Sequence, residues 1–334
     1  MNYIGSKFRL SDWIYETVNK TVNKDLTDMI FCDIFAGTGI VGRKFKRHVK
    51  QVLSNDCEFY SYVLNKNYIE NSKPLENTTS LIDYLNNLPL KNDGFIYKNY
   101  CISENSQRQY FSNENGKKID TIRTKIEELK NEKSINDNMY YFLLCSLLES
   151  ADKVANTASV YGAYLKQLKK TAQKQLILTP ADFEITENNN IVYNTDSNKL
   201  IKDISGDILY LDPPYNERQY GANYHLLNTI AEYKEFIPKG KTGLREYNRS
   251  SYCKKAEVAN SFEELIKNAN FKYIFLSYNN EGLMSEEQIK DIMSKYGKYS
   301  LSTKDYQRFR ADKDSSTRIY KGNTTVEYLH ILEK

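Results

Sequence analysis

Apolar residues recur at helical and then at strand spacing over the first seventy positions of the chain. One group has helical spacing and predicts a helix near residues 8–24: Leu10, Trp13, Ile14 and Val18. The apolar run 29–35 predicts a buried strand, and a helix over about 40–48 follows its glycine-rich end. A second strand over 51–56 then leads into a helix through Tyr62 and Tyr68. Strands that alternate with helices are typical of a parallel sheet.

That alternation stops near Asn71, and the chain to about Asn190 is polar and poor in strand signals. Within this stretch the pattern predicts three helices, near 117–132, near 136–150 and through 161–166. Apolar strand patterns then return at 191–196, 208–211, 273–278 and 328–332. We therefore expect an α/β fold in which residues 1–70 and 191–334 form a sheet domain and 71–190 form a mainly helical insertion.

Composition and charge exclude several classes of protein. The chain of 334 residues is 40% hydrophobic and 27% charged, and no apolar stretch is long enough to span a membrane. Its N-terminus lacks the layout of a signal peptide. The 5 cysteines and 3 histidines are scattered without metal-ligand or disulfide spacing, so we expect no metal and a reducing, cytoplasmic environment. A net charge of +4 permits nucleic-acid binding without arguing for it.

A glycine-rich turn follows the first predicted strand. The segment Gly37-Thr38-Gly39-Ile40-Val41-Gly42 matches G-x-G-x-x-G, and Asp56 ends the next strand. Glycines let a ligand approach the backbone and the acid can hold ribose hydroxyls, so a nucleoside-containing cofactor is favoured over a plain tight turn. Asp33 lies just before this turn, where a carboxylate suits an ammonium group and would be misplaced beside a pyrophosphate.

The most specific motif is Asp212-Pro213-Pro214-Tyr215, directly after the apolar run 208–211. It places an acid, two rigid prolines and an aromatic ring at the carboxyl end of a strand, where open α/β sheets bind ligands. The alternative is an ordinary strand-ending turn. A dehydrogenase, which the glycine turn would also fit, has no evident use for this tetrapeptide.

Together these motifs resemble the S-adenosylmethionine-dependent adenine-N6 DNA methyltransferases of restriction–modification systems. Five segments carry the resemblance: Tyr3–Lys7, Asp33–Gly39, Asn55-Asp56, Asp212–Tyr215 and Leu276–Asn280. Their order, with the insertion between the glycine turn and the tetrapeptide, resembles the α-type arrangement. The resemblance implies a Rossmann-like class I methyltransferase sheet with helices on both faces. The helical insertion would then be a target-recognition region.

The resemblance also implies which residues bind S-adenosylmethionine. The expected set is Tyr3, Lys7, Asp33, Phe35, Gly37, Thr38, Gly39, Asp56, Asp196 and Asp212. Asp33 and the glycine turn would hold the methionine part, and Asp56 the ribose. For Lys7 the alternative is a solvated surface lysine. Asp196 has two equal interpretations, a contact to the cofactor adenine and a simple turn acid.

Methyl transfer to adenine N6 has to overcome delocalisation of the nitrogen lone pair into the ring. Acceptors for both amino hydrogens would favour a tetrahedral nitrogen, and the Asp212 carboxylate and the Pro213 carbonyl can supply them on a backbone fixed by Pro214. Tyr215 offers a face for stacking, and the base must leave the duplex. We therefore expect in-line displacement without a covalent enzyme intermediate. The segment 216–224 is either a lid over the flipped base or a plain loop that leads into a helix starting near Tyr224.

Two basic regions are candidates for DNA contact. One is the loop 236–260, and the other is a set of lysines in the insertion that could equally be a solvated face: Lys166, Lys169, Lys170 and Lys174. A third, weaker candidate is the segment 306–310. The expected DNA-binding residues are Lys241, Arg245, Arg249, Arg218 and Arg308. The expected partners are double-stranded DNA and a companion restriction endonuclease. The resemblance places the protein in the bacterial cytoplasm, at the nucleoid.

Other functions remain open on the sequence. An RNA methyltransferase acting on an adenine or guanine amine uses related tetrapeptides. A protein-amide methyltransferase fits less well, because its motif begins with Asn whereas position 212 is Asp. A non-catalytic DNA-binding subunit would not need intact residues at both the glycine turn and the tetrapeptide.

Overall fold

The chain divides into two compact units, each built from separate segments of the sequence. The computed structural model describes residues 6–307 and 324–334. By their internal contacts, the described residues of 6–57, 188–219, 248–307 and 324–334 form one unit, which we call the sheet unit. Residues 58–187 and 220–247 belong to the other, the helical unit. No helix among the described residues is long and apolar enough to cross a membrane.

The sheet unit contains one large sheet, which among the described residues has 7 strands in the order β5-β2-β1-β6-β7-β9-β8. The strands are β1 Ile30–Asp33, β2 Gln51–Asn55, β5 Ile191–Tyr193, β6 Ser205–Leu211, β7 Asn270–Asn279, β8 Lys298–Gln307 and β9 Thr324–Glu333. The first five in spatial order run parallel, whereas β9 runs antiparallel to both β7 and β8. The expected α/β fold with a mostly parallel sheet is confirmed.

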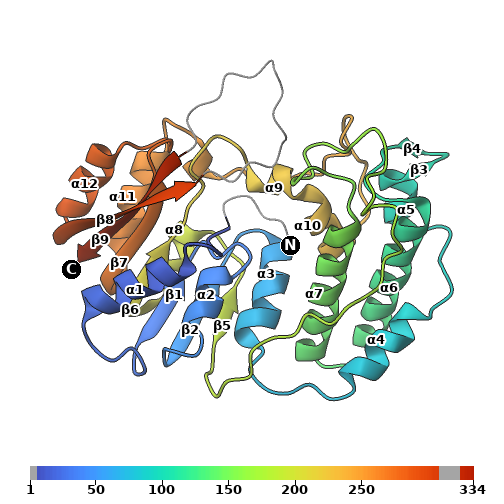
Figure 1. The fold of residues 1–334 in the computed structure, drawn as a ribbon, viewed down its shortest axis with the longest axis horizontal. Helices are drawn as coiled ribbons and strands as arrows, with labels where there is room; N and C mark the ends of the chain where they lie inside the picture. The colour runs from blue at the N-terminus through green and yellow to red at the C-terminus, as the bar shows by residue number, and fades with distance from the viewer. Residues whose placement is uncertain (1–5, 308–323) are drawn as a thin grey trace. The chain divides into compact units, whose positions relative to one another are not determined.

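Helices cover both faces of this sheet (Figure 1). On one face lie α1 (Ser11–Val22) and α2 (Ile40–Phe45), where Phe31 stacks on Phe45 with ring centroids 3.9 Å apart. Lys304 of β8 lies over the Trp13 ring of α1 on that face, at 5.9 Å. On the other lie α8 (Ser197–Leu200), α11 (Val258–Asn268) and α12 (Glu286–Ser294). They bury a single apolar cluster against alternate strand residues, as the period of two in a strand requires.

The helical unit packs around two long helices, α6 (Asn113–Asn131) and α7 (Asp137–Val154). Each begins at a polar cap, because the Ser112 and Asn136 side chains accept backbone N–H groups of the first turn. The remaining elements are α3 Phe59–Asn65, the π-helix η1 Lys66–Glu70, α4 Thr78–Asn86, α5 Phe95–Tyr100, β3 Ile102–Ser103, β4 Ser106–Gln107, α9 Tyr220–Asn223 and α10 His225–Glu232. One apolar core joins them.

Most predicted elements are present with different bounds, some shorter and some longer, but the helix predicted through 161–166 is wrong. The backbone there is committed to distant partners: Tyr161 N–H donates to the Asn223 carbonyl and Leu165 N–H to the Asn156 carbonyl. The Tyr161 carbonyl also accepts from the Tyr110 hydroxyl at 2.7 Å. These contacts replace the helical ladder. The lysines at 166–174 therefore do not form one face of a helix.

Several elements had no counterpart in the sequence analysis. They are α4, α5, α8, α9, α11, α12, the short hairpin β3–β4 and strand β8. The division into units also differs from the ranges derived from the sequence. Residues 58–70 and 220–247 group with the helical unit, and the segment 236–260 is shared between the two units. Its second half contains the 3-10 helix η2 (Ser251–Cys253) and the start of α11.

Candidate functional site

The predicted motifs meet at the carboxyl edge of the parallel strands in the sheet unit. Strand β1 lies between β2 and β6, and Asp33 is in register with Ser54 on one side and Tyr210 on the other. Parallel strands end at the same edge, so the glycine turn after β1 and the tetrapeptide after β6 emerge side by side. The sheet topology therefore brings together residues that lie far apart in the sequence.

Asp212 holds two donors on a single oxygen. Its Oδ1 accepts from Lys7 Nζ at 2.9 Å and from the Tyr215 hydroxyl at 2.6 Å. Lys7 Nζ also lies 4.8 Å from the centroid of the Tyr215 ring. In the part of the chain that the structure describes, no hydrogen bond reaches the second carboxylate oxygen, Oδ2. The carboxylate is thus oriented by its neighbours and presents one oxygen for a further donor.

Lys7 is not a solvated surface lysine. Its side chain is 6% exposed, and that of Asp212 is 19% exposed. Buried charges in proteins are ordinarily paired, and here each partner supplies the other's counter-charge. The resemblance implied a cofactor contact for Lys7, which stays a prediction; the structure adds a direct contact between Lys7 and the tetrapeptide.

Tyr215 is held in place by β7 and by the segment that follows it. It packs against the Tyr278 ring at 4.7 Å between centroids, and its carbonyl accepts from Leu283 N–H at 3.0 Å. Burial and the adjacent Asp212 carboxylate raise the pKa of the Tyr215 hydroxyl well above its ordinary value. The phenol therefore stays protonated and can go on donating to Asp212.

Asp33 is a buried acid that lacks a full set of partners. It is 1% exposed, and its Oδ1 accepts no hydrogen bond within the described ranges. Burial, together with the carboxylates of Asp212 and Asp56, raises the pKa of Asp33 well above its ordinary value. A cationic ligand group would remove this penalty by supplying both a charge and a donor. Asp33 thus fits an ammonium group of the kind that methionine carries.

The glycine turn has the conformation that its residues allow. Gly37 and Gly39 have φ of 52° and 73°, a left-handed region in which side chains are strained. The Gly37 N–H donates to Asp56 Oδ2 at 2.8 Å, so the acid that ends β2 also fixes the turn. Beside it, the buried Asn55 amide donates to the carbonyls of Ile34 and Thr195. Asn55 therefore ties three neighbouring strand ends together.

Two members of the expected cofactor set have other neighbours. Asp196 is exposed and caps α8, accepting from Lys199 N–H at 3.0 Å. That geometry matches the turn-acid interpretation. Phe35 packs edge-on against the Tyr252 ring, with centroids 5.0 Å apart. The sequence analysis did not predict Tyr252 as a neighbour of Phe35. Tyr252 lies in the three-residue helix η2, which is too short to have a recognisable sequence pattern.

Glu327 is a further acid at this edge that the sequence analysis missed. It lies on β9 opposite Asn279 and is 8% exposed. Burial raises the pKa of Glu327. The positive charge of Lys7 lowers this pKa and the negative charge of Asp212 raises it, so the Glu327 carboxyl group interacts electrostatically with the ion pair. The signal was an acid within an otherwise apolar strand pattern.

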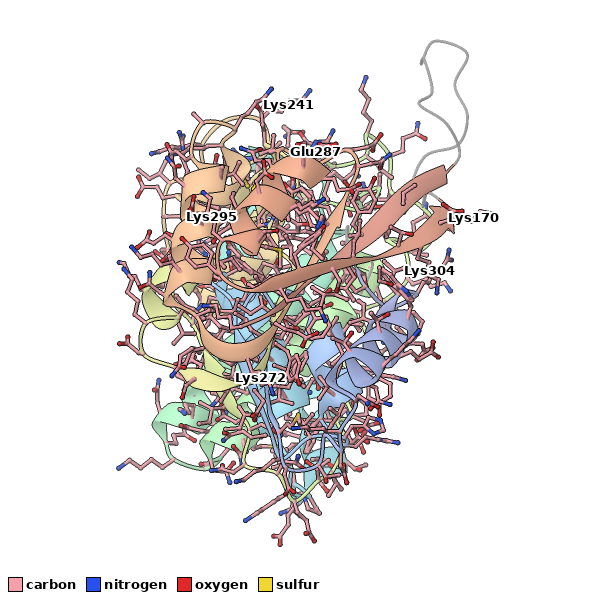
Figure 2. All side chains as sticks on the ribbon, turned by 90° about the vertical axis from the view of Figure 1, so that its left-hand side faces the viewer. Lys170, Lys241, Lys272, Glu287, Lys295 and Lys304 are labelled. Atoms are coloured by element: carbon pink, nitrogen blue, oxygen red, sulfur yellow. The ribbon has the colours of Figure 1, made fainter. Side chains whose placement is uncertain are left out.

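The predicted DNA-binding residues differ in how exposed they are. Arg218 and Arg249 are exposed on the sheet unit, and Lys241 is exposed on the helical unit, where Figure 2 shows its side chain extending away from the ribbon. Arg245 is instead occupied within the helical unit, because its guanidinium pairs with Glu232 at 2.8 Å. Tyr3 and Arg308 lie outside the described residues.

The segment after the tetrapeptide contains only one short helix among the described residues, α9. Tyr224, one of its predicted lid aromatics, is fully buried in the helical core and cannot cover a base there. Within the described ranges, no three His, Cys, Asp or Glu side chains gather as a metal ion would require.

Comparison with known proteins identifies the family. Residues 3–292 match the D12 class N6 adenine-specific DNA methyltransferases. The chain is 60% identical over 334 residues to the Type II methyltransferase M.NlaIII of Neisseria lactamica, covering 100% of this chain and 99% of that protein. It is 41% identical over 330 residues to M.CviAII of Paramecium bursaria Chlorella virus 1, covering 98% and 97%.

A longer relative contains this chain as about half of its length. The Type II methyltransferase M.FokI of Planomicrobium okeanokoites is 40% identical over 350 residues, covering 100% of this chain and 53% of that protein. The described residues have the mixed α/β fold with a mostly parallel sheet given above, and the methyl donor is S-adenosylmethionine. The chain belongs to the D12 class of N6 adenine-specific DNA methyltransferases and is an enzyme of the kind found in restriction–modification systems.

Proposed function

We propose that the carboxyl edge of the sheet unit is the active site, with Asp212 as the group that binds the adenine amine. One observation carries this proposal: both ordering contacts of Asp212 converge on Oδ1, and Oδ2 is left for a new donor. The N6 hydrogens would be accepted by Asp212 Oδ2 and by the Pro213 carbonyl, with Pro214 fixing the backbone. Tyr215 would stack on the base.

The chemistry then needs positioning more than covalent help. S-adenosylmethionine supplies a methyl group that its sulfonium already activates. Asp212 and Pro213 orient the amine so that its lone pair points at that methyl group. The N–C bond would form as the S–C bond of the donor breaks, and one N6 proton would pass to the Asp212 carboxylate and from there to solvent. Lys7 serves as a positioning residue that holds the Asp212 carboxylate still.

We assign the cofactor end from the same geometry. The unpartnered Oδ1 of Asp33 would take the ammonium group of the methionine part, beside Phe35, Gly37, Thr38 and Gly39. Asp56 would hold the ribose hydroxyls while it fixes the turn. Asp196 would keep its role as a helix cap, with its side chain exposed at the adenine end.

The substrate base must reach this edge from within a duplex. An adenine amine in stacked DNA is inaccessible to such a site, so we propose that the base is flipped out. We further propose that Lys241, Arg249 and Arg218 contact the duplex. We also propose that the protein acts together with a companion restriction endonuclease, because its relatives are Type II methyltransferases and modification methylases. Its proposed location is the cytoplasm, at the nucleoid.

The test is sequencing of adenine methylation in DNA from a methylation-deficient host that expresses the protein. We expect one modified motif with the wild type and none with Asp212→Ala, provided that the variant still binds S-adenosylmethionine. Asp203→Ala is the matched control, because Asp203 is an exposed acid of the same unit. Retained methylation in Asp212→Ala would overturn the assignment. Unmodified DNA from the wild type would shift the substrate to RNA.

A further inference from the structure

The turn Lys239–Leu244 of the helical unit is a closed and firmly held element. Lys239 and Leu244 exchange two backbone hydrogen bonds, at 2.9 and 2.8 Å. Gly240 and Gly243 have φ of 67° and 70°, which only glycine adopts without strain. The segment is therefore a preformed turn, although composition alone suggests a flexible basic loop.

Two side chains hold this turn in place: Tyr100, the last residue of α5, and Arg108, which directly follows β4. Arg108 donates to the Asn99 carbonyl at 3.1 Å and to the Gly240 carbonyl at 3.0 Å. The Tyr100 hydroxyl donates to the Gly243 carbonyl at 2.7 Å. A Cβ added at Gly243 would lie 2.9 Å from atoms of both side chains, so the turn is packed tightly against them.

The chain just before the turn is fixed as well. Phe236 packs on Phe95 with centroids 5.2 Å apart, and the Arg245 guanidinium lies 5.8 Å from the Phe236 ring. Between this anchor and the turn stands Ile237, followed by Pro238, whose ring limits the backbone. Ile237 is 86% exposed, the highest exposure among the large exposed hydrophobic residues within the described ranges.

Ile237 is thus an aliphatic side chain presented to solvent from a rigid support beside Lys239 and Lys241. A lone exposed isoleucine needs no explanation on most surfaces. Here, however, the support is preorganised. Lys239 pairs with Glu246 at 3.4 Å, and Lys241 at the tip of the turn is an exposed cation, which suits a contact to DNA. Because an isoleucine has no donor or acceptor, the feature of the major groove that it can read is the thymine methyl group.

We propose that Ile237 contacts a thymine C5-methyl group in the target site, with Lys241 on a nearby phosphate and Arg108 as the positioning residue for the turn. This inference rests on double-stranded DNA being the substrate. Such a substrate always offers the contact, because the adenine that is methylated pairs with thymine and every target site therefore contains one. A turn that is already ordered would contact DNA without the entropy cost of ordering a loop.

The experiment uses the full-length protein and duplexes that carry the motif found by methylation sequencing. Ile237→Ala is compared with Ile177→Ala, a matched control because Ile177 is 63% exposed on the same unit. We expect Ile237→Ala to lower kcat/KM for the target duplex by between about 3-fold and 10-fold, from the loss of apolar contact. The control should change it by less than about 2-fold.

Uracil in place of thymine then identifies the contact, since it removes only the methyl group. At one thymine of the motif, the substitution should lower kcat/KM of the wild type by about the same factor as Ile237→Ala does. The same uracil duplex should cause no further loss in Ile237→Ala, because the contact is already absent. Arg108→Ala should raise KM for the target duplex and weaken this uracil discrimination while the unfolding temperature and kcat stay close to those of the wild type.

The proposal is overturned if Ile237→Ala changes kcat/KM no more than Ile177→Ala does. It is also overturned if, at every thymine, the loss caused by uracil adds to the loss caused by Ile237→Ala. This failure differs from failure of the proposed function. In that case the wild type would not methylate the unsubstituted duplex at all.

Discussion

Lys7 and Asp212 form an ion pair of 2.9 Å although 205 positions separate them in the sequence. The pair joins the segment that precedes α1 to the tetrapeptide that follows β6. It also gives the carboxylate a fixed orientation, because the Tyr215 hydroxyl donates to the same oxygen. A catalytic acceptor that must point at an amine benefits from such an arrangement more than from negative charge alone.

Replacing Lys7 should therefore reduce turnover more than cofactor binding. We expect Lys7→Ala to lower kcat by about 10-fold to 100-fold, because the Asp212 carboxylate loses its buried counter-ion and its fixed orientation. Lys20→Ala is the control, since Lys20 is an exposed lysine on α1. Single-turnover methylation together with S-adenosylmethionine titration measures both quantities. Loss of cofactor affinity with normal kcat would favour the direct cofactor contact inferred from the sequence.

The hydroxyl and the ring of Tyr215 should be separable. Tyr215→Phe removes the donor to Asp212 and keeps the stacking face, so we expect kcat to fall by roughly 10-fold while KM for DNA stays within about 2-fold. Tyr215→Ala removes both and should also weaken capture of the flipped base. Steady-state kinetics on the target duplex distinguishes the two. Equal effects of the two variants would show that the hydrogen bond is the whole contribution.

Cofactor binding should depend on pH through Asp33. In the free protein the pKa of Asp33 is raised, chiefly by burial, so at low pH the carboxyl group is protonated and cannot pair with an ammonium group. Affinity for S-adenosylmethionine should increase as the pH rises through this raised pKa, and binding below it should release a proton. Calorimetry in two buffers of different ionisation enthalpy measures that proton. Asp33→Asn should bind weakly and release none.

Buried histidines should make the protein sensitive to acid. Burial lowers the pKa of His225 and of His330 to about 4, compared with 6.5 for the ordinary side chain. The unfolded chain therefore binds more protons than the folded protein between these values, and stability is lost as the pH falls from 6.5 towards 4. Each histidine accounts for about 3 kcal/mol of this loss.

Denaturant unfolding across that pH range tests the origin of the slope. His225→Gln should be less stable than the wild type at neutral pH but should lose less stability on acidification, because it cannot take up the proton. An unchanged slope in His225→Gln would mean that other groups, such as the paired carboxylates, cause the acid sensitivity.

Local pattern was sufficient for the elements whose signal lies within one run of residues. The strands β1, β2, β6 and β7 have apolar runs, and the motifs at their carboxyl ends follow from chain order alone. Helix α11 was missed even though its buried residues Val258, Phe262, Leu265 and Ile266 have helical spacing. Strand β8 has a mainly polar pattern, which its pairing along one edge with β9 overrides.

The sequence by itself determined the chemistry of the carboxyl edge: an acid before a glycine turn, an acid after the next strand, and the tetrapeptide at Asp212. These features need only residue type and distance along the chain. The partners of charged groups required the tertiary structure. Lys7 is buried against Asp212, Arg245 is occupied by Glu232, and Lys241 stays exposed, although all three are basic residues in plausible motifs. The reason is physical, because the energy of a charge depends on its burial and on its nearest counter-charge, and packing of distant segments decides both.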